Sequence, residues 1–447
     1  MQTGGAITLS QPARFPGPPP DSADAVIIGG GIAGVMTALY LARAGQRVVL
    51  CEKGRIAGEQ SSRNWGWVRQ QGRDPAELPI MIESLRLWDS LNQQLREAVG
   101  LHRTGTTYLA NTPADLDNFE SWLPHARQHG LDTRMMTRAE LDALLPNAAG
   151  WLGALHTASD ARAEPWTAVP AIAALAASEG ASLHEDCAVR GIETAAGRVS
   201  GVVTEHGPVA APLVLLAGGA WSGLFAGNDG LRLPQLSVRA TVAATGPMPE
   251  FFPGNAADSG FAFRRRADGG YTLAQGIGHD FWTGPAAFRN LVAYLPQIRR
   301  DLRHTRLQLA APSGYPDGWA TPRRWALDRE TPFERMRVLD PAPNLGRIAR
   351  LSDDFAAAFP ALGRPVIARA WAGMIDVLPD QVPVLDESPV PGLFVATGLS
   401  GHGFGIGPGV GRVMADLMTG RPAGHDLTRF RYGRFGDGSR IELGFSI

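Results

Sequence analysis

A glycine-rich turn between two apolar segments near the start of the chain constrains the fold more than any other feature. Ala25–Ile28 is a short apolar run of the kind that forms a buried parallel strand. Residues 29–34 follow as G-x-G-x-x-G, and residues 31–44 have the periodicity of a helix. Arg47–Cys51 has the pattern of a second strand, which leads to Glu52. Strand, glycine turn, helix, strand and acid in this order predict a dinucleotide-binding unit.

Each glycine of the turn has its own expected role. Gly29 permits the tight turn, Gly31 lets a pyrophosphate approach the backbone, and Gly34 lets the helix lie close to the strand. The helix N-terminus offers free N–H groups and a positive dipole to the phosphates. Glu52 is placed to accept hydrogen bonds from ribose hydroxyls. The stretch alone fits NAD and FAD equally well.

The composition is that of a globular enzyme and excludes several other classes. A chain of 447 residues is long enough for two or three lobes. Its residues are 44% hydrophobic and 19% charged, and the net charge is −1 with no basic block that would bind nucleic acid. No apolar run approaches the ~18 residues of a membrane span, and the first 20 residues do not resemble a signal peptide. Cys51 and Cys187 indicate neither a disulfide framework nor a metal site. We therefore expect a cytoplasmic protein with no metal centre.

Three glycine-rich turns, at residues 29–34, 217–222 and 398–411, each follow an apolar strand. Such turns gather around one ligand crevice at the carboxyl ends of parallel strands. A helix expected over 410–420 would follow the third turn, and its N-terminus would stabilise the negative charge that a flavin pyrimidine gains on reduction. Three glycine turns and the single acidic residue Glu52 fit one bound FAD better than an NAD that binds and leaves in each cycle.

The pattern along the chain predicts an α/β fold with a discontinuous nucleotide-binding domain. Alternating apolar and polar segments after residue 233 indicate an antiparallel sheet, and apolar strands return after residue 365. The expected divisions are a flexible or surface-draped Pro/Gly-rich extension (1–22), an FAD-binding domain (23–75, 160–232 and 365–432), an α+β substrate domain (76–159 and 233–364) and a C-terminal tail (433–447).

Several motifs give the chain a family resemblance over residues 25–432. They are VIIGGGIAGVMTALYLARAGQRVVLCEK, the SSRN loop at 61–64, the stretch with Asp160, Arg162, Glu164 and Pro165, LLAGGAWS, LPDQVPVLDE (Leu378–Glu387) and GLSGHGFGIGPGVG. The chain resembles the FAD-dependent D-amino-acid oxidase/glycine oxidase superfamily of amine-oxidising flavoenzymes. The resemblance implies a Rossmann-like FAD-binding domain and a substrate domain whose large, mostly antiparallel sheet covers the flavin. It also implies hydride transfer from the carbon next to an amine to flavin N5, which gives an imine that water hydrolyses.

The turns and the resemblance together assign a set of expected FAD contacts. These are Gly29, Gly31, Ile32, Ala33, Gly34, Glu52, Lys53, Ser61, Ser62, Arg63, Asn64, Trp65, Gly66, Val189, Ala217, Gly218, Trp221, Gly373, Gly401, His402, Gly403, Phe404 and Gly405. Some sarcosine-type relatives in that superfamily hold FAD through a cysteine at the position of Gly373. Neither cysteine of this chain is near that position in the sequence, so we expect non-covalent FAD.

Lys53 is the only lysine of the chain, which separates it from those sarcosine-type relatives. The relatives use one lysine near the flavin for reaction with oxygen and another in the C-terminal glycine loop, where this chain has Gly405. The difference favours a dehydrogenase that passes electrons to a quinone or a partner protein. An oxidase that uses O2 stays open.

Without lysine, arginine must hold any substrate carboxylate, and its fork suits bidentate binding. The resemblance places Arg69 at the carboxylate-binding position, with a structural ion pair as the alternative. Trp67, Trp371 and His402 complete the expected catalytic pocket, although the tryptophans also suit packing between domains and His402 suits a loop-capping hydrogen bond. Weaker pocket candidates are Arg324, His279 and Tyr271.

Three functional hypotheses follow from these features. The first is an FAD-dependent oxidase or dehydrogenase that acts on the C–N bond of an amino acid or a related secondary or cyclic amine. The second is a flavoprotein subunit that works only inside a multi-subunit dehydrogenase. The third is a non-catalytic FAD-binding protein, whose flavin no amine would bleach.

Overall fold

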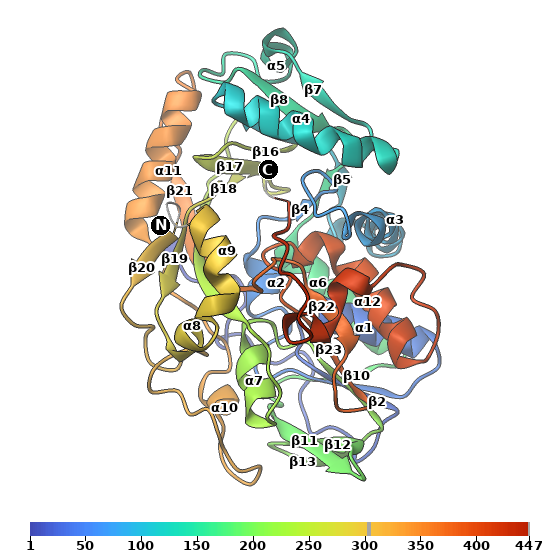
Figure 1. The fold of residues 1–447 in the computed structure, drawn as a ribbon. Coiled ribbons are helices and arrows are strands. Elements are labelled where there is room, and N and C mark those ends of the chain that lie inside the picture. The colour runs from blue at the N-terminus through green and yellow to red at the C-terminus, as the bar shows by residue number, and fades with distance from the viewer. Residues whose placement is uncertain (302–304, 446–447) are drawn as a thin grey trace.

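The computed structural model describes residues 1–301 and 305–445. Within these residues a six-stranded sheet and an eleven-stranded sheet dominate the architecture, beside two small three-stranded sheets (Figure 1). No helix among them is both long and apolar enough to cross a membrane.

The six-stranded sheet is assembled from three separate parts of the chain. Its order is β10 (Ser182–His184), β3 (Val48–Cys51), β2 (Ala25–Ile28), β14 (Leu213–Leu216), β23 (Leu393–Thr397) and β22 (Val384–Glu387). The first five strands are parallel and β22 is antiparallel to β23. Every residue of β2 and β3 is buried, as expected for strands covered on both faces. The predicted return of the chain to this sheet is confirmed.

Helices cover one face of this sheet and a small sheet covers the other. Ala25 and Ile27 of β2 face a core formed with α1 (Ile32–Arg43), α3 (Leu78–Leu95), α6 (Pro165–Ser178) and α12 (Gly403–Met418). Val26 and Ile28 face the opposite core. That core includes β11 (Val189–Ala195), β12 (Arg198–Thr204), β13 (Gly207–Ala210) and α7 (Ser222–Asn228).

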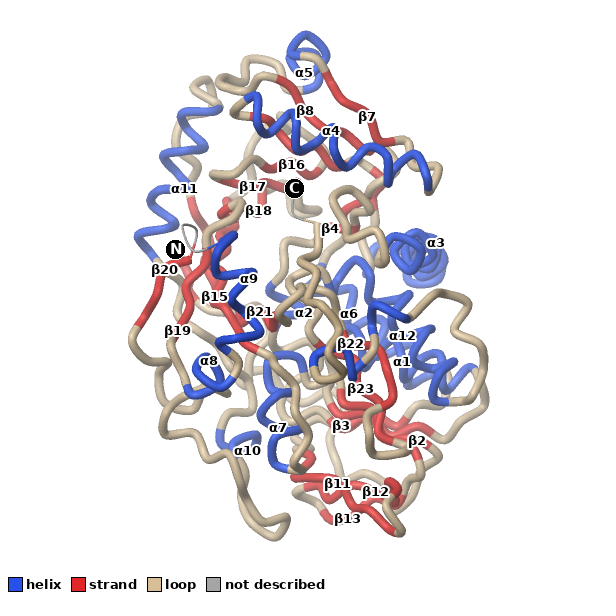
Figure 2. The backbone as a smooth tube through the Cα atoms, viewed as in Figure 1, coloured by secondary structure: helices blue, strands red, loops and turns tan. Residues whose placement is uncertain are grey.

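The second, larger sheet is mostly antiparallel, as predicted, and its strands are drawn in red in Figure 2. Its main path is β1 (Gln2–Thr3), β21 (Ile367–Val377), β15 (Leu236–Thr245), β18 (Tyr271–Gln275), β17 (Phe261–Arg265), β16 (Asn255–Ala257), β6 (Thr106–Ala110), β8 (Gly153–Thr157) and β7 (Thr133–Met136). A branch is formed by β19 (His279–Trp282) and β20 (Thr305–Gln308). The remaining elements are α2 (Gln60–Arg63), α4 (Pro113–Gln128), α5 (Arg138–Leu144), α8 (Pro285–Arg289), α9 (Leu291–Asp301), α10 (Pro332–Arg335), α11 (Leu345–Ala358), β4 (Trp67–Val68), β5 (His102–Arg103) and β9 (Ala161–Arg162).

The glycine run at 398–411 differs from its prediction, because most of it is helix rather than turn. Helix α12 begins at Gly403, seven residues before the expected start. A Cβ on Gly407 would lie 2.3 Å from Ile32 Cγ1, and a Cβ on Gly411 would lie 2.3 Å from Met36 Cβ. These glycines therefore let α12 pack directly against α1, which fixes the start of α12 beside the glycine turn.

The expected domain limits also need correction. Strand β21, which the limit at residue 365 assigned to the FAD-binding domain, pairs with β15 in the large sheet. Helix α3, assigned to the substrate domain, packs with α1 and α12. The first 22 residues are not a free extension, because β1 pairs with β21 and Gly4 N donates to Ala370 O at 2.9 Å. In the tail, Arg434 forms a buried ion pair with Asp380 at 2.7 Å.

Candidate functional site

A crevice opens at the carboxyl ends of β2, β3 and β14, where the first two glycine turns meet. The predicted contacts that line it are Gly29, Gly31, Glu52, Lys53, Ser61, Val189, Ala217, Gly218 and Trp221. These residues come from three distant parts of the sequence. The crevice therefore brings together two of the three glycine turns that the sequence predicted would share one ligand, and no residue of the third turn, 398–411, lines it.

Close backbone packing explains two of the glycines in the first turn. Gly29 has φ +109°, and a Cβ there would lie 2.6 Å from Ala217 O. A Cβ on Gly34 would lie 2.0 Å from Gly29 O, so the helix can approach the strand only with glycine at this position. The tight turn and the close helix–strand contact are thus both present, as a dinucleotide site requires.

Glu52 lies at the end of β3 and faces the glycine turn. Its carboxylate accepts hydrogen bonds from Gly30 N at 2.7 Å and from Gly54 N at 2.8 Å. Burial raises the pKa of Glu52 to about 7, although the charge of Lys53 and the two backbone N–H groups oppose the shift. Its location in the crevice fits an acceptor for the ribose hydroxyls of FAD.

Lys53 is held in a network and has no donor left for catalysis. Its Nζ donates to Glu59 Oε1 at 2.6 Å, to Met336 O at 2.7 Å and to Arg337 O at 3.0 Å. The ammonium also lies 4.4 Å from the ring centroid of Trp221, whose Nε1 donates to Glu59 Oε2 at 3.0 Å. The three donors of the ammonium thus match three acceptors, and the lysine shapes the crevice wall.

Arg63, in the loop after Glu52, has several protein partners, and its contact with FAD stays a prediction. Arg63 is buried, and its guanidinium donates to Asp340 at 2.8 Å, to Ala372 O at 3.0 Å and to Gly58 O at 2.9 Å. These bonds use both terminal nitrogens, whereas Arg63 Nε is buried and has no hydrogen-bond partner among the described residues. Ser61 Oγ instead accepts from Ile32 N at 2.8 Å, at the first turn of α1.

Gln60, which the sequence did not single out, occupies the space beside Gly373. A Cβ on Gly373 would lie 1.8 Å from Gln60 Oε1, so no larger residue fits there without moving the amide. That oxygen is buried and has no hydrogen-bond partner among the described residues, and Gln60 lines the crevice. An unpaired acceptor at this place fits a site that a polar cofactor completes. No nearby motif signals the role of this amide.

Several predicted pocket residues belong to the packing of the large sheet. Trp371 is buried, its Nε1 donates to Arg63 O at 2.9 Å, and its ring lies 5.3 Å from Trp166. Tyr271 is fully buried and donates to Phe252 O at 2.8 Å, so it is a core residue. Arg324 is exposed and bonds Asn228 O, and His279 bonds Thr305 on the β19–β20 branch. None of these four is grouped with Arg69.

Arg69 lacks the structural ion pair that was the alternative to its predicted role in carboxylate binding. Its guanidinium lies 5.5 Å from the ring centroid of Tyr108 and bonds Gln71 O. No carboxylate among the described residues forms an ion pair with it. Trp67 lies beside Tyr108 at 6.3 Å between centroids. Arg69 is therefore a half-buried cation that is available to an anionic ligand.

Asp160 fixes the segment that follows Arg69. Its carboxylate is fully buried and accepts from Gln70 N at 2.7 Å and from Gln71 N at 3.3 Å. Burial raises the pKa of Asp160 to about 6, against the effect of these N–H groups and of the nearby Arg69 charge. This residue of the family motif thus orders the backbone that carries the arginine.

Arg73, which sequence reasoning missed, joins Arg69 to His402. Its Nε donates to Arg69 O at 3.2 Å and its Nη2 to His402 O at 3.0 Å, while Nη1 pairs with Glu77 at 3.2 Å. Arg73 and Glu77 are both 1% exposed, and burial lowers the pKa of Arg73 to about 10. The four-residue spacing of an arginine and a glutamate before an apolar helix was the available signal.

His402 lies just before the first turn of α12, above the Arg73–Glu77 pair. Its Nδ1 is 3.7 Å from Glu77 Oε2 and has no hydrogen-bond partner among the described residues. Burial lowers the pKa of His402, although Glu77 opposes the shift. A neutral imidazole next to the half-buried Arg69 gives one acceptor and one cation at the same side of the large sheet.

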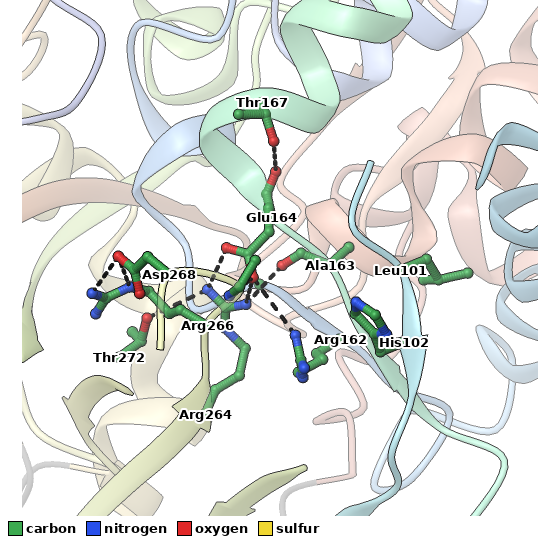
Figure 3. A network of polar contacts seen from close by, with 12 residues as sticks. Leu101, His102, Arg162, Ala163, Glu164, Thr167, Arg264, Arg266, Asp268 and Thr272 are labelled. Carbon is green, nitrogen blue, oxygen red and sulfur yellow. Dashed lines mark hydrogen bonds and ion pairs between the residues drawn. The ribbon is translucent and has the colours of Figure 1, made fainter. Parts of the chain in front are cut away.

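The rest of the Asp160–Pro165 motif forms a polar network between β17 and the start of α6 (Figure 3). Arg264 binds both oxygens of Glu164, at 2.8 and 3.3 Å, and Arg162 approaches the same carboxylate at 3.7 Å. A Cβ on Gly66 would lie 2.8 Å from Arg264 Cζ. The network therefore holds the large sheet against the loop that contains Trp65 and Trp67.

Comparison with known proteins is consistent with this geometry. Residues 24–417 match the model of the family described as FAD dependent oxidoreductase. The structure of L-amino acid deaminase from Proteus myxofaciens in complex with anthranilate is 29% identical, with a TM-score of 0.91 and coverage of 98% of each chain.

Two curated relatives extend the comparison to multi-part enzymes. Sarcosine oxidase subunit beta of Rhizobium meliloti is 26% identical over 96% of this chain and 92% of its own. Human mitochondrial sarcosine dehydrogenase is 23% identical over 96% of this chain, but this chain covers only 43% of that protein. The chain thus spans less than half the length of the mitochondrial dehydrogenases that it matches.

Proposed function

Because the chain belongs to the FAD-dependent oxidoreductase family that residues 24–417 match, we propose that it oxidises the C–N bond of an amino acid or a related secondary or cyclic amine. The observation that carries the proposal is the half-buried Arg69, which lacks a carboxylate partner and lies beside Tyr108. Bound FAD supplies the hydride acceptor, and water hydrolyses the imine product.

The crevice residues are proposed to hold FAD without a covalent bond. Glu52 accepts from the ribose, and the backbone at Gly29 and Gly31 faces the pyrophosphate. Gly373 offers no nucleophile, and the space for a side chain there is taken by Gln60. The N–H groups at the start of α12 favour negative charge on the flavin.

On the substrate side, Arg69 is proposed to bind the carboxylate through its fork and thereby to orient the reacting carbon. Tyr108 supports the guanidinium with its ring. Burial lowers the pKa of His402, which favours its neutral form, and a neutral imidazole can accept a hydrogen bond from the substrate amine. Trp67 excludes water from this side of the site, since only 9% of it is exposed.

The experiment that tests the proposal is anaerobic mixing of the FAD-loaded protein with D- and L-amino acids, N-methyl amino acids and cyclic amines. Bleaching of the flavin absorbance by at least one of them is expected. No bleaching by any of them would sink the proposal and favour a non-catalytic FAD-binding protein.

The electron acceptor is proposed to be a quinone or a partner protein, because no lysine is available for reaction with oxygen. Repeating the best substrate in air and measuring peroxide separates this acceptor from O2. The cytoplasmic location stays a prediction of the sequence.

A second candidate is a subunit of a multi-subunit dehydrogenase, and the match to sarcosine oxidase subunit beta over nearly its whole length favours it. Steady turnover by the purified single chain with an artificial acceptor would count against this candidate. Bleaching without turnover would support it.

A further inference from the structure

Exposed apolar side chains are concentrated in one region of the large-sheet side of the molecule. Among the described residues, thirteen large hydrophobic side chains are exposed, and seven of them lie within residues 288–319. We call these seven the α8–α9 patch: Phe288, Leu291, Val292, Leu295, Leu307, Leu309 and Trp319. Single exposed hydrophobic residues need no explanation, but a contiguous group marks an interaction surface.

Direct contacts join α8, the loop after β20 and β20 itself, and α9 follows α8 directly in the chain. The rings of Phe288 and Trp319 lie 6.0 Å apart, which joins α8 to the loop after β20. Trp319 Nε1 donates to Thr283 O at 3.0 Å, and Thr283 N donates to Gln308 O at 2.9 Å. Gln308 lies between Leu307 and Leu309, so β20 continues the same surface.

Helix α9 has one face anchored and the other uncovered. The buried Tyr294 hydroxyl lies 2.7 Å from Val377 O, at the end of β21, and 2.9 Å from Pro234 O. Leu291, Val292 and Leu295 are 47%, 80% and 39% exposed. Helices α8 and α9 lie apart from α1, α3 and α12 (Figure 1), so none of those helices covers this face.

Three exposed arginines lie on α8, α9 and β20, the elements that form most of the patch. Arg289, Arg299 and Arg306 are exposed, and none of them forms an ion pair with a carboxylate that the structure describes. The nearby Asp317 is already bound by Arg323 and by Ala286 N. An apolar helix face with an exposed tryptophan and unpaired arginines is the combination found where helices lie on anionic lipid.

We propose that the α8–α9 patch docks the protein on the surface of a bilayer that contains anionic lipid. The apolar side chains enter the head-group boundary, and the arginines bind lipid phosphates. The patch would lie at the membrane surface, so this mode of binding needs no helix that spans the bilayer. It does not depend on the substrate or on the proposed reaction.

The test is cosedimentation of the full-length, FAD-loaded protein with vesicles of phosphatidylcholine, with and without phosphatidylglycerol. We expect binding to the phosphatidylglycerol vesicles that weakens as salt is raised. Val292→Asp should weaken binding roughly tenfold or more, because it removes an apolar contact and adds repulsion. Val366→Asp is the matched control, since Val366 is also 80% exposed but lies outside the patch.

Three results would overturn the proposal. In the first, the unmodified protein does not bind the vesicles. In the second, Val366→Asp loses as much binding as Val292→Asp. In the third, the protein self-associates, and Val292→Asp converts it to a monomer without changing vesicle binding. The last result would assign the patch to a protein contact. Because the assay needs no turnover, it stands apart from the amine panel that tests the proposed function.

Discussion

Replacing Arg73 with Met tests whether one buried ion pair organises the substrate side of the site. The change removes the three donors that hold Glu77, Arg69 O and His402 O. It leaves the Glu77 carboxylate, which is 1% exposed, buried without its cation. Loss of one partner of a buried pair costs about 3–5 kcal/mol of unfolding free energy.

The double variant Arg73→Met/Glu77→Met separates stability from positioning. Replacing both members of a buried pair with apolar groups is often nearly neutral, so most of the lost stability should return. The carbonyls of Arg69 and His402 still lack their donor, so KM for a carboxylate-bearing substrate should stay raised. Substrate titration and urea unfolding of the FAD-saturated protein measure the two effects.

Arg103→Met provides a matched control for the ion pair. Arg103 and Asp89 pair at the surface with side chains 39% exposed, and such pairs contribute less than about 1 kcal/mol. An Arg73→Met variant no less stable than Arg103→Met would refute the reasoning. A double variant with normal KM would remove the positioning role and leave only a structural one.

Three further predictions test separate parts of the structure. Gly29→Ala should abolish FAD retention, measured as flavin per protein, whereas Gly45→Ala, also at positive φ but with open space around its Cβ, should keep it. Gly411→Ala should lower the melting temperature because its Cβ would meet Met36 at 2.3 Å, and an unchanged melt would contradict the α1–α12 packing. The pKa of Asp160 is raised from 3.8 to about 6 in the folded protein, so the native state binds the proton more tightly. The contribution of Asp160 to the free energy of unfolding therefore falls by about 3 kcal/mol as pH rises from 3.8 to about 6. Urea unfolding at several pH values should show this decrease in the unmodified protein but not in Asp160→Asn.

The sequence predicted the parts of the fold that local geometry dictates. The turn at 29–34 was readable because Gly29 needs a positive φ and Gly34 needs a bare Cα within the same short unit. The start of α12 was not readable, because the glycines that suggested a turn are required by α1, about 370 residues earlier in the chain.

The site shows the same division between local and distant causes. The roles of Arg69 and His402 stay predictions, whereas the link that Arg73 makes between them was missed because it depends on two carbonyls that the fold brings to Arg73. The ion pair of Arg63 was not foreseen because its partner Asp340 is 277 residues away. Trp371 in the pocket stays a prediction, and its packing beside Trp166 was not foreseen because it depends on the position of β21 in the large sheet.

The measurement that tests the central claim most directly is the apparent dissociation constant of an amino acid that reduces the flavin, in the unmodified protein and in Arg69→Met. Bidentate binding of a carboxylate by Arg69 predicts an increase of about 30- to 150-fold, the effect of about 2–3 kcal/mol from a charge-assisted bond. Arg324→Met, at an exposed arginine outside the group, should leave the constant unchanged. An equal constant in Arg69→Met and the unmodified protein would contradict the account.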